Sequence, residues 1–127
     1  MDDLYREIIL DHYKHPRNFG SLKNPDASAE KDNPVCGDSI KMELKIENGK
    51  LKVIDINFSG QGCAISMASS SMLTEKVNGM KINSLLKISK DDIVEMLGTE
   101  LTPARVKCAI LPLEVIHKAV KTYGKKE

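Results

Sequence analysis

The chain has 127 residues, of which 41% are hydrophobic and 29% are charged, and its formal net charge is +1. This length suffices for one core and is too short for two ordinary domains, so we expect a single domain over residues 1–127. A charge so near zero gives no electrostatic reason to expect nucleic acid or a membrane surface as a partner. The N-terminus lacks the basic and apolar regions of a secretory signal, and the three cysteines are an odd number. We therefore expect a cytoplasmic protein with reduced thiols rather than a disulfide framework.

The first predicted element is a helix over residues 2–14. Asp2 or Asp3 can cap its start, and His15 precedes a proline, which moves its backbone out of the helical region. Residues 17–34 are rich in Asn, Pro, Gly, Ser and Asp and predict a loop. Within this loop we expect a short edge strand near residues 27–31.

Two strands should follow as a hairpin. Residues 40–47 alternate hydrophobic and charged side chains, which is the period of a strand with one face in water. Asn48-Gly49 is a preferred pair for a two-residue type I′ turn, so residues 51–58 should return as the antiparallel partner. The hydrophobic residues of this second strand change parity between Val53 and Ile54, which predicts a β-bulge near them.

After Gly62 the hydrophobic pattern becomes helical, and Gly79 indicates where that helix ends. The spacing predicts one apolar stripe made of Ile65, Ala68, Met72, Val77 and Met80. Cys63 then falls at or just before the start of this helix. There the helix dipole and free N–H groups favour a thiolate over a thiol.

Three more helices are predicted in the C-terminal part. Asn83 can cap a short helix that reaches residue 86, and Ser89 with Asp92 forms a capping-box pattern for a helix closed by Gly98. Thr102-Pro103 predicts the start of a last helix, which Pro112 should kink or restart. Together the elements predict an α+β fold in which a three-stranded antiparallel sheet packs with about five helices.

Each cysteine lies in a polar or glycine-bearing setting. The settings are N-P-V-C-G-D at Cys36, G-Q-G-C at Cys63 and R-V-K-C at Cys108. Structural cysteines are usually buried in apolar runs, whereas these surroundings are typical of thiolates that bind metal or accept sulfur. We interpret the three as parts of one composite site built from distant segments.

Asp38 adds an oxygen donor to the three thiolates. Four such donors suit tetrahedral Zn²⁺ or an iron–sulfur cluster with one unusual ligand. The glycines at 37, 60 and 62 would leave room for a metal. Spacing alone is weak evidence, because the chain has no C-x-x-C pair, so three unrelated buried thiols remain the alternative.

Other polar residues are weaker candidates for this site. His12 lies on the first predicted helix, and such a histidine more often packs or faces solvent than binds metal. The serines at 66 and 69–71 lack the histidine and acid of a nucleophilic triad, so we interpret them as capping or packing residues. Arg105 lies one helical turn before Cys108 and could act on the site, with a solvated helix face as the alternative.

Four motifs occur in a fixed order along the chain. They are D-H-Y-K-H-P-R-N-F-G at 11–20, C-G-D at 36–38, G-C-A-I-S at 62–66 followed by A-S-S-S at 68–71, and K-C at 107–108. With these motifs the whole chain resembles the scaffold family of iron–sulfur cluster assembly, the IscU, SufU and NifU N-terminal type. The resemblance implies a compact α+β domain with a three-stranded antiparallel sheet.

The resemblance also implies a function and partners. Cys36, Asp38, Cys63 and Cys108 would hold a [2Fe-2S] cluster built from Fe²⁺ and sulfur. A cysteine desulfurase would deliver that sulfur as a persulfide to one of the three cysteines. Apo iron–sulfur proteins would receive the cluster, and an electron donor such as ferredoxin would assist. The protein would then be a scaffold or carrier rather than an enzyme.

Two departures from the family pattern bear on the alternatives. Lys107 stands where Isc-type proteins carry histidine, so Lys107-Cys108 resembles the Suf-type pattern. As a cation, Lys107 would stabilise the thiolate or offset the negative site rather than bind metal. Suf-type zinc-dependent sulfurtransferases carry an insertion between the second and third cysteines, and the segment here is too short for it. The chain thus mixes features of both branches, which favours a scaffold and leaves a sulfurtransferase with Zn²⁺ in the same site as the alternative. A purely structural zinc is disfavoured because such sites usually take four closed ligands, often in paired C-x-x-C knuckles, and this one would include an aspartate. L-T-P-A-R at 101–105 replaces the L-P-P-V-K read by an Hsp70-type chaperone, which is therefore a doubtful partner.

Overall fold

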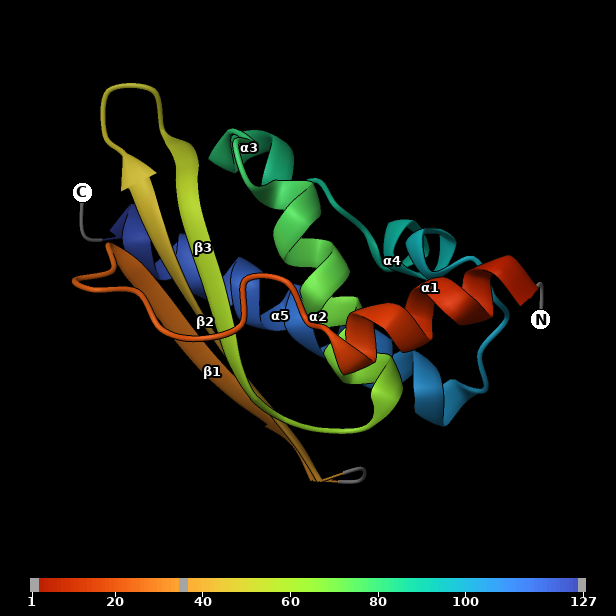
Figure 1. Cartoon of the computed structure of the whole chain (residues 1–127). Coiled ribbons are helices and arrows are strands. Elements are labelled where there is room, and N and C mark those ends of the chain that lie inside the picture. The colour runs from red at the N-terminus through yellow and green to blue at the C-terminus, as the bar shows by residue number, and fades with distance from the viewer. Residues whose placement is uncertain (1–2, 35–36, 126–127) are drawn as a thin grey trace.

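The computed structural model describes residues 3–34 and 37–125. Its elements are α1 (Asp3–Lys14), β1 (Ala27–Asn33), β2 (Asp38–Glu47), β3 (Lys52–Gln61), α2 (Ala64–Val77), α3 (Ile82–Leu85), α4 (Lys90–Leu97) and α5 (Pro103–Lys125). Within the described residues, five helices accompany a three-stranded antiparallel sheet, which confirms the predicted α+β class (Figure 1). No helix in these described ranges combines the length and apolar character needed to cross a bilayer.

The strands pair in the order β1-β2-β3, so β2 is central. The edge strand near 27–31 is confirmed and continues to Asn33, which pairs with Asp38 at the start of β2. Between β2 and β3, Lys45 faces Asp55 while Ile46 faces Val53, so Ile54 is the extra residue of a bulge. The predicted bulge is therefore present, and it lets the hydrophobic residues on both sides of it face the core.

The connection between β2 and β3 differs from the expected type I′ turn. Residues 48–51 link the strands, and neither Asn48 nor Gly49 has the positive φ that a type I′ turn requires. Instead the Lys50 N–H donates to the Glu47 carbonyl over 3.3 Å, and Leu51 adopts a φ of 48°. The Ile82 N–H donates to the Leu51 carbonyl over 2.9 Å, so a tertiary contact with the start of α3 holds the longer loop.

The face of β2 that we expected in water is partly covered. Ile40, Met42 and Leu44 are fully buried on the core face, as their alternation predicts. Glu43 points the other way and is also buried. The reason is the loop after α1, whose Leu22 N–H donates to Oε1 of Glu43 over 3.2 Å.

The helices lie in a layer against the sheet, and α5 is the link between them. It contacts β1 and β2, while α2 packs between α5 and α1 and also touches β3 (Figure 1). Pro112 does not restart this helix, since α5 runs unbroken from Pro103 to Lys125. One hydrophobic cluster joins the buried residues of the sheet and helices. This packing brings the start of α2 beside the first half of α5.

The predicted apolar stripe of α2 is only partly correct. Ala68 and Val77 are buried, but Ile65 and Met72 are half-buried, and Met80 lies beyond the helix. The buried surface of α2 also includes the four serines at 66 and 69–71. Because α2 has neighbours on several sides, small side chains that allow close approach replace a single apolar face.

The later helix ends mostly follow their predicted caps. Ser89 and Asp92 form a reciprocal capping box, and Gly98 closes α4 in the left-handed region with a φ of 69°. The short α3 begins at Ile82 and Lys81 occupies its N-cap position. Asn83 therefore lies inside α3 and is not its cap. The Thr102 side chain accepts a 3.4 Å hydrogen bond from the Arg105 N–H at the start of α5.

Candidate metal centre

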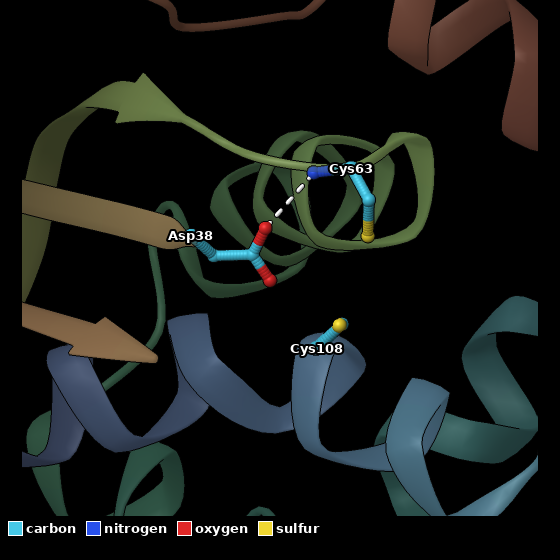
Figure 2. Close-up of side chains that lie close together, drawn as sticks. All are labelled: Asp38, Cys63 and Cys108. Carbon is cyan, nitrogen blue, oxygen red and sulfur yellow. Dashed lines mark hydrogen bonds between the residues drawn. The ribbon is translucent and has the colours of Figure 1, made fainter. Parts of the chain in front are cut away.

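Three predicted site residues converge from three elements. Asp38 is the first residue of β2, Cys63 directly precedes α2, and Cys108 lies on α5. A carboxylate oxygen of Asp38 and the two sulfur atoms all lie within 4.8 Å of one another. Figure 2 shows the two sulfurs and the carboxylate pointing toward a common space. Cys36, the third predicted thiolate, lies outside the described residues.

Asp38 has one satisfied and one unsatisfied oxygen. The residue is only 1% exposed, and its Oδ1 accepts a 2.9 Å hydrogen bond from the Cys63 N–H (Figure 2). Its Oδ2 is buried and has no hydrogen-bond partner among the described residues. Leaving a buried carboxylate oxygen without a partner is unfavourable, and a bound cation would remove that cost. The local chemistry therefore fits a metal ligand.

Two glycines permit the close approach of β3 to the site. At Gly62 a Cβ atom would lie 2.3 Å from Ser66 Oγ and 2.6 Å from Asp38 Oδ1. At Gly60, where φ is +130°, a Cβ atom would lie 1.9 Å from the Ser39 carbonyl oxygen. The G-Q-G-C sequence thus supplies the space that lets Cys63 reach Asp38.

The start of α2 makes the site electrostatically favourable for anions. Cys63 occupies the N-cap position with extended backbone angles, and its side chain makes no capping hydrogen bond. Its sulfur can therefore face Asp38 and Cys108 instead of the helix backbone. The partial positive charge at a helix N-terminus stabilises nearby thiolate and carboxylate groups.

The two described thiols differ in accessibility. Cys108 is fully buried, with 0% of its surface exposed, whereas Cys63 is half-buried. A depression of about 350 Å³ opens beside Asp38 and is lined in part by Asn33, Gly37 and Gln61. The exposure of the two thiols, rather than this depression, makes Cys63 more accessible to reagents from solvent than Cys108.

Arg105 and Lys107 are both exposed on α5. Lys107 lines a groove of about 530 Å³ that α5 forms with the end of β1 and the start of α4. Their contribution to the charge of the site stays a prediction.

The donor set determines what the centre can hold. Two thiolates and a carboxylate are three of the four ligands of a tetrahedral zinc or iron site. Thiolate is a soft ligand suited to iron–sulfur clusters, while a carboxylate oxygen is a harder one. Such a mixed set can bind either Zn²⁺ or an iron–sulfur cluster once a fourth donor is supplied.

His12 lies apart from the metal centre and joins α1 to α2. It is 8% exposed, and its Nδ1 lies 2.7 Å from the Ser71 Oγ, which also accepts a 2.8 Å hydrogen bond from the Arg17 N–H. Burial, followed by the charge of Arg17, lowers the pKa of His12 below its ordinary value. These contacts agree with the interpretation of His12 as a packing residue.

The serine run has contacts that the sequence did not indicate. Ser69 Oγ donates a 2.6 Å hydrogen bond to the Ala109 carbonyl on α5, next to Cys108. Ser70 Oγ donates over 2.8 Å to the Ser66 carbonyl within α2. The two serines are equivalent in the sequence pattern. Only the packing of α2 on α5 shows that Ser69 bonds to the neighbouring helix while Ser70 bonds within its own.

Fold and site together define a small α+β protein with a thiol–carboxylate centre at the meeting of one strand and two helices. A family model described as the NifU-like N terminal domain matches residues 4–127. The chain belongs to this family.

Curated relatives include proteins with two different named activities. The zinc-dependent sulfurtransferase SufU of Bacillus subtilis (strain 168) is 38% identical, and the alignment covers 94% of this chain and 91% of the relative. The iron–sulfur cluster assembly scaffold protein IscU of Escherichia coli (strain K12) is 37% identical, with 96% and 95% covered. The IscU scaffold of Aquifex aeolicus (strain VF5) is 38% identical, with 97% and 78% covered.

Solved structures share the fold. A hypothetical protein matches with a TM-score of 0.78 and 32% identity, covering 95% of this chain and 99% of that one. The N-terminal part of a NifU-like protein from Brucella abortus has a TM-score of 0.77, with 99% and 98% covered. Its identity is 23%, so this match supports the fold alone.

Proposed function

We propose that the chain is a scaffold on which [2Fe-2S] clusters are assembled and then passed to apo-proteins. The observation that carries this proposal is the convergence of Asp38, Cys63 and Cys108, whose ligand atoms lie within 4.8 Å of one another. One buried oxygen of Asp38 also has no partner among the described residues. Cys36 is the fourth proposed ligand. Residues 1–127 act as one unit, in a reducing compartment such as the cytoplasm that keeps the thiols reduced.

Sulfur enters by thiol exchange. A thiolate of the chain attacks the terminal sulfur of the persulfide on a cysteine desulfurase. The sulfur–sulfur bond on the desulfurase breaks, a new one forms on the chain, and the desulfurase cysteine leaves as a thiolate. The half-buried Cys63 is open to such an attack in this conformation, whereas the fully buried Cys108 needs the site to open first.

Electrons are needed to convert this sulfur to sulfide. Each transferred sulfur takes up two electrons, so two sulfurs need four. Two ferrous ions supply two electrons when they become ferric in the cluster. An electron donor such as ferredoxin supplies the other two, and the chain itself is a carrier rather than an enzyme.

The Asp38 carboxylate makes the site easier for a bound cluster to leave. An oxygen ligand suits an iron–sulfur cluster less well than a thiolate does, so Asp38 keeps the cluster labile. The exposed cations Arg105 and Lys107 of α5 offset the negative charge of the thiolate and carboxylate ligands. Acceptors are apo iron–sulfur proteins.

A second candidate function is zinc-dependent sulfur transfer, which is favoured by the name of the B. subtilis relative. In that case Asp38, Cys63 and Cys108 hold Zn²⁺ and one cysteine accepts the persulfide. The alignment to that relative runs over 137 residues, more than this chain contains, so the relative has residues without a counterpart here. The alignments to the two IscU relatives, over 123 and 125 residues, show no such excess. This difference supports the scaffold over the sulfurtransferase.

The test is anaerobic reconstitution with Fe²⁺, cysteine and a cysteine desulfurase. Visible absorbance would be read together with iron, sulfide and zinc per chain, and an apo-ferredoxin would then be added. We expect a cluster that forms on the chain and moves to the ferredoxin, and Cys63→Ser should prevent its formation. Tightly held zinc, no cluster and faster desulfurase turnover would overturn the scaffold and establish the sulfurtransferase.

A further inference from the structure

A buried hydrogen bond connects the two helices that carry the described thiols. Ser69 of α2 donates to the Ala109 carbonyl of α5 over 2.6 Å, and both residues are 0% exposed. Ala109 directly follows Cys108, and Ser69 lies on the helix that begins directly after Cys63. The bond therefore joins the two backbones on which the sulfur atoms are mounted.

The helix turn around Cys108 lacks one backbone hydrogen bond, so the bond from Ser69 can stabilise it. In an α-helix, residue 112 would donate its N–H to the carbonyl of residue 108, but Pro112 has no N–H to donate. A turn that lacks this bond is more easily deformed, and a deformation there would move Cys108 relative to Cys63. Ser69 contacts this same turn from the neighbouring helix.

We propose that Ser69 is a positioning residue that sets the spacing between the thiols of Cys63 and Cys108. Its hydroxyl acts through the Ala109 backbone, to which it donates. Hydrogen bonds behind metal ligands commonly change metal affinity by about 10- to 100-fold, because they fix ligand geometry. The expected effect of Ser69 on metal affinity rests on the proposed function. Its expected effect on the spacing of the two thiols is independent of that function.

The chain offers a matched control in the next residue. Ser70 is also a fully buried serine of α2, but its hydroxyl donates to the Ser66 carbonyl within the same helix, over 2.8 Å. Ser69→Ala and Ser70→Ala thus each remove one buried hydroxyl and one hydrogen bond to a carbonyl. Only the first removes a bond between α2 and α5. Thermal melts of the metal-free variants would report how far each change affects the fold.

The first measurement uses metal alone. Co²⁺ would be titrated into each chain while its thiolate charge-transfer and visible bands are followed, and Zn²⁺ affinity would be measured by competition with a coloured chelator. We expect Ser69→Ala to bind Zn²⁺ about tenfold more weakly with altered cobalt bands, by analogy with other supporting hydrogen bonds. Ser70→Ala should keep the wild-type bands and affinity, even if both variants melt at lower temperature.

The second measurement needs no metal. In a Cys36→Ser background only Cys63 and Cys108 remain as thiols, and a trivalent arsenical, phenylarsine oxide, bridges two nearby thiols. Two arsenic–sulfur bonds form, and the arsenic oxygen leaves as water with both thiol protons, so no oxidant is required. We expect Ser69→Ala to weaken this bridging and Ser70→Ala to leave it unchanged.

The two measurements separate the failure of the inference from the failure of the proposed function. If Ser69→Ala matches Ser70→Ala in arsenical bridging, Ser69 does not set the spacing, and the inference is wrong. If the wild-type chain shows no thiolate bands with Co²⁺, the metal centre fails while the arsenical comparison still decides the role of Ser69. Weaker bridging in Ser69→Ala alone supports the inference in either case.

Discussion

The backbone N–H of Cys63 donates a 2.9 Å hydrogen bond to Oδ1 of Asp38, while Oδ2 of the same carboxylate is buried without a partner among the described residues. One oxygen thus holds the start of α2 in place, and the other is available to a cation. A group kept in an unfavourable state before its ligand binds is a common feature of functional sites. Asp38 therefore links the architecture of the site to its proposed chemistry.

Asp38→Asn should separate these two roles. The amide oxygen can still accept the Cys63 N–H, but the buried negative charge is lost, so we expect the metal-free chain to gain about 1 kcal/mol in free energy of unfolding. Zn²⁺ affinity should fall at least tenfold, since an amide is a poorer ligand than a carboxylate. Urea unfolding and chelator competition measure the two effects. Asp38→Ala, which also removes the acceptor, should be less stable than Asp38→Asn; the opposite order would contradict the role of the hydrogen bond.

The two described thiols should react at different rates. Because Cys63 is half-buried and Cys108 fully buried, we expect iodoacetamide to modify Cys63 at least about tenfold faster in the native, metal-free chain. Peptide mapping by mass spectrometry would give the rate for each cysteine. In urea the two rates should become similar. Equal rates in the native chain would mean that the site opens on the timescale of the reaction.

Gly62→Ala should damage the metal centre specifically. The added methyl group would press on Ser66 Oγ and Asp38 Oδ1, and such crowding typically costs about 1–3 kcal/mol of stability. We also expect weaker Zn²⁺ binding, because Asp38 must move to make room. Gly49→Ala is the control, since a Cβ atom there meets nothing within 4 Å. Unchanged zinc affinity in Gly62→Ala would show that the site tolerates this displacement.

Stability should fall as the pH is lowered through the range of histidine titration. Burial lowers the pKa of His12 and of His117 below their ordinary value of 6.5. The unfolded chain therefore binds protons more readily than the folded one, so the stabilisation is complete above about pH 6.5 and is lost as the pH falls below it. Urea unfolding of the metal-free chain, repeated at pH values about one unit apart between about pH 5 and 8, measures how the free energy of unfolding depends on pH.

A pair of variants would assign part of that slope. His12→Gln removes the titrating group that lies against Ser71, so its stability should depend less on pH than that of the wild type. His15→Gln is the control, because His15 is exposed. An unchanged slope in His12→Gln would assign the pH dependence to other groups.

Local sequence signals predicted the elements whose cause is local. The capping box at Ser89, the left-handed Gly98 and the alternation of β2 are all confirmed, because each depends on residues a few positions apart. The bulge at Ile54 also followed from a change of parity within one strand. Two predictions failed because a distant segment intervened. The turn after β2 is longer because Ile82 binds Leu51, and Glu43 is buried because the loop at Leu22 covers it.

Residue types and their order along the chain were enough to predict the α+β class and the family, and they indicated Cys36, Asp38, Cys63 and Cys108 as candidate ligands. The packing of distant segments was needed to show that Asp38, Cys63 and Cys108 meet and that Asp38 keeps one oxygen without a partner among the described residues. The packing also buries Cys108 while it leaves Cys63 partly open. It also decided that Ser69 binds across to α5 while Ser70 binds within α2. The physical reason is that distances between atoms far apart in the chain depend on how helices and strands pack, and that packing is a property of the whole core.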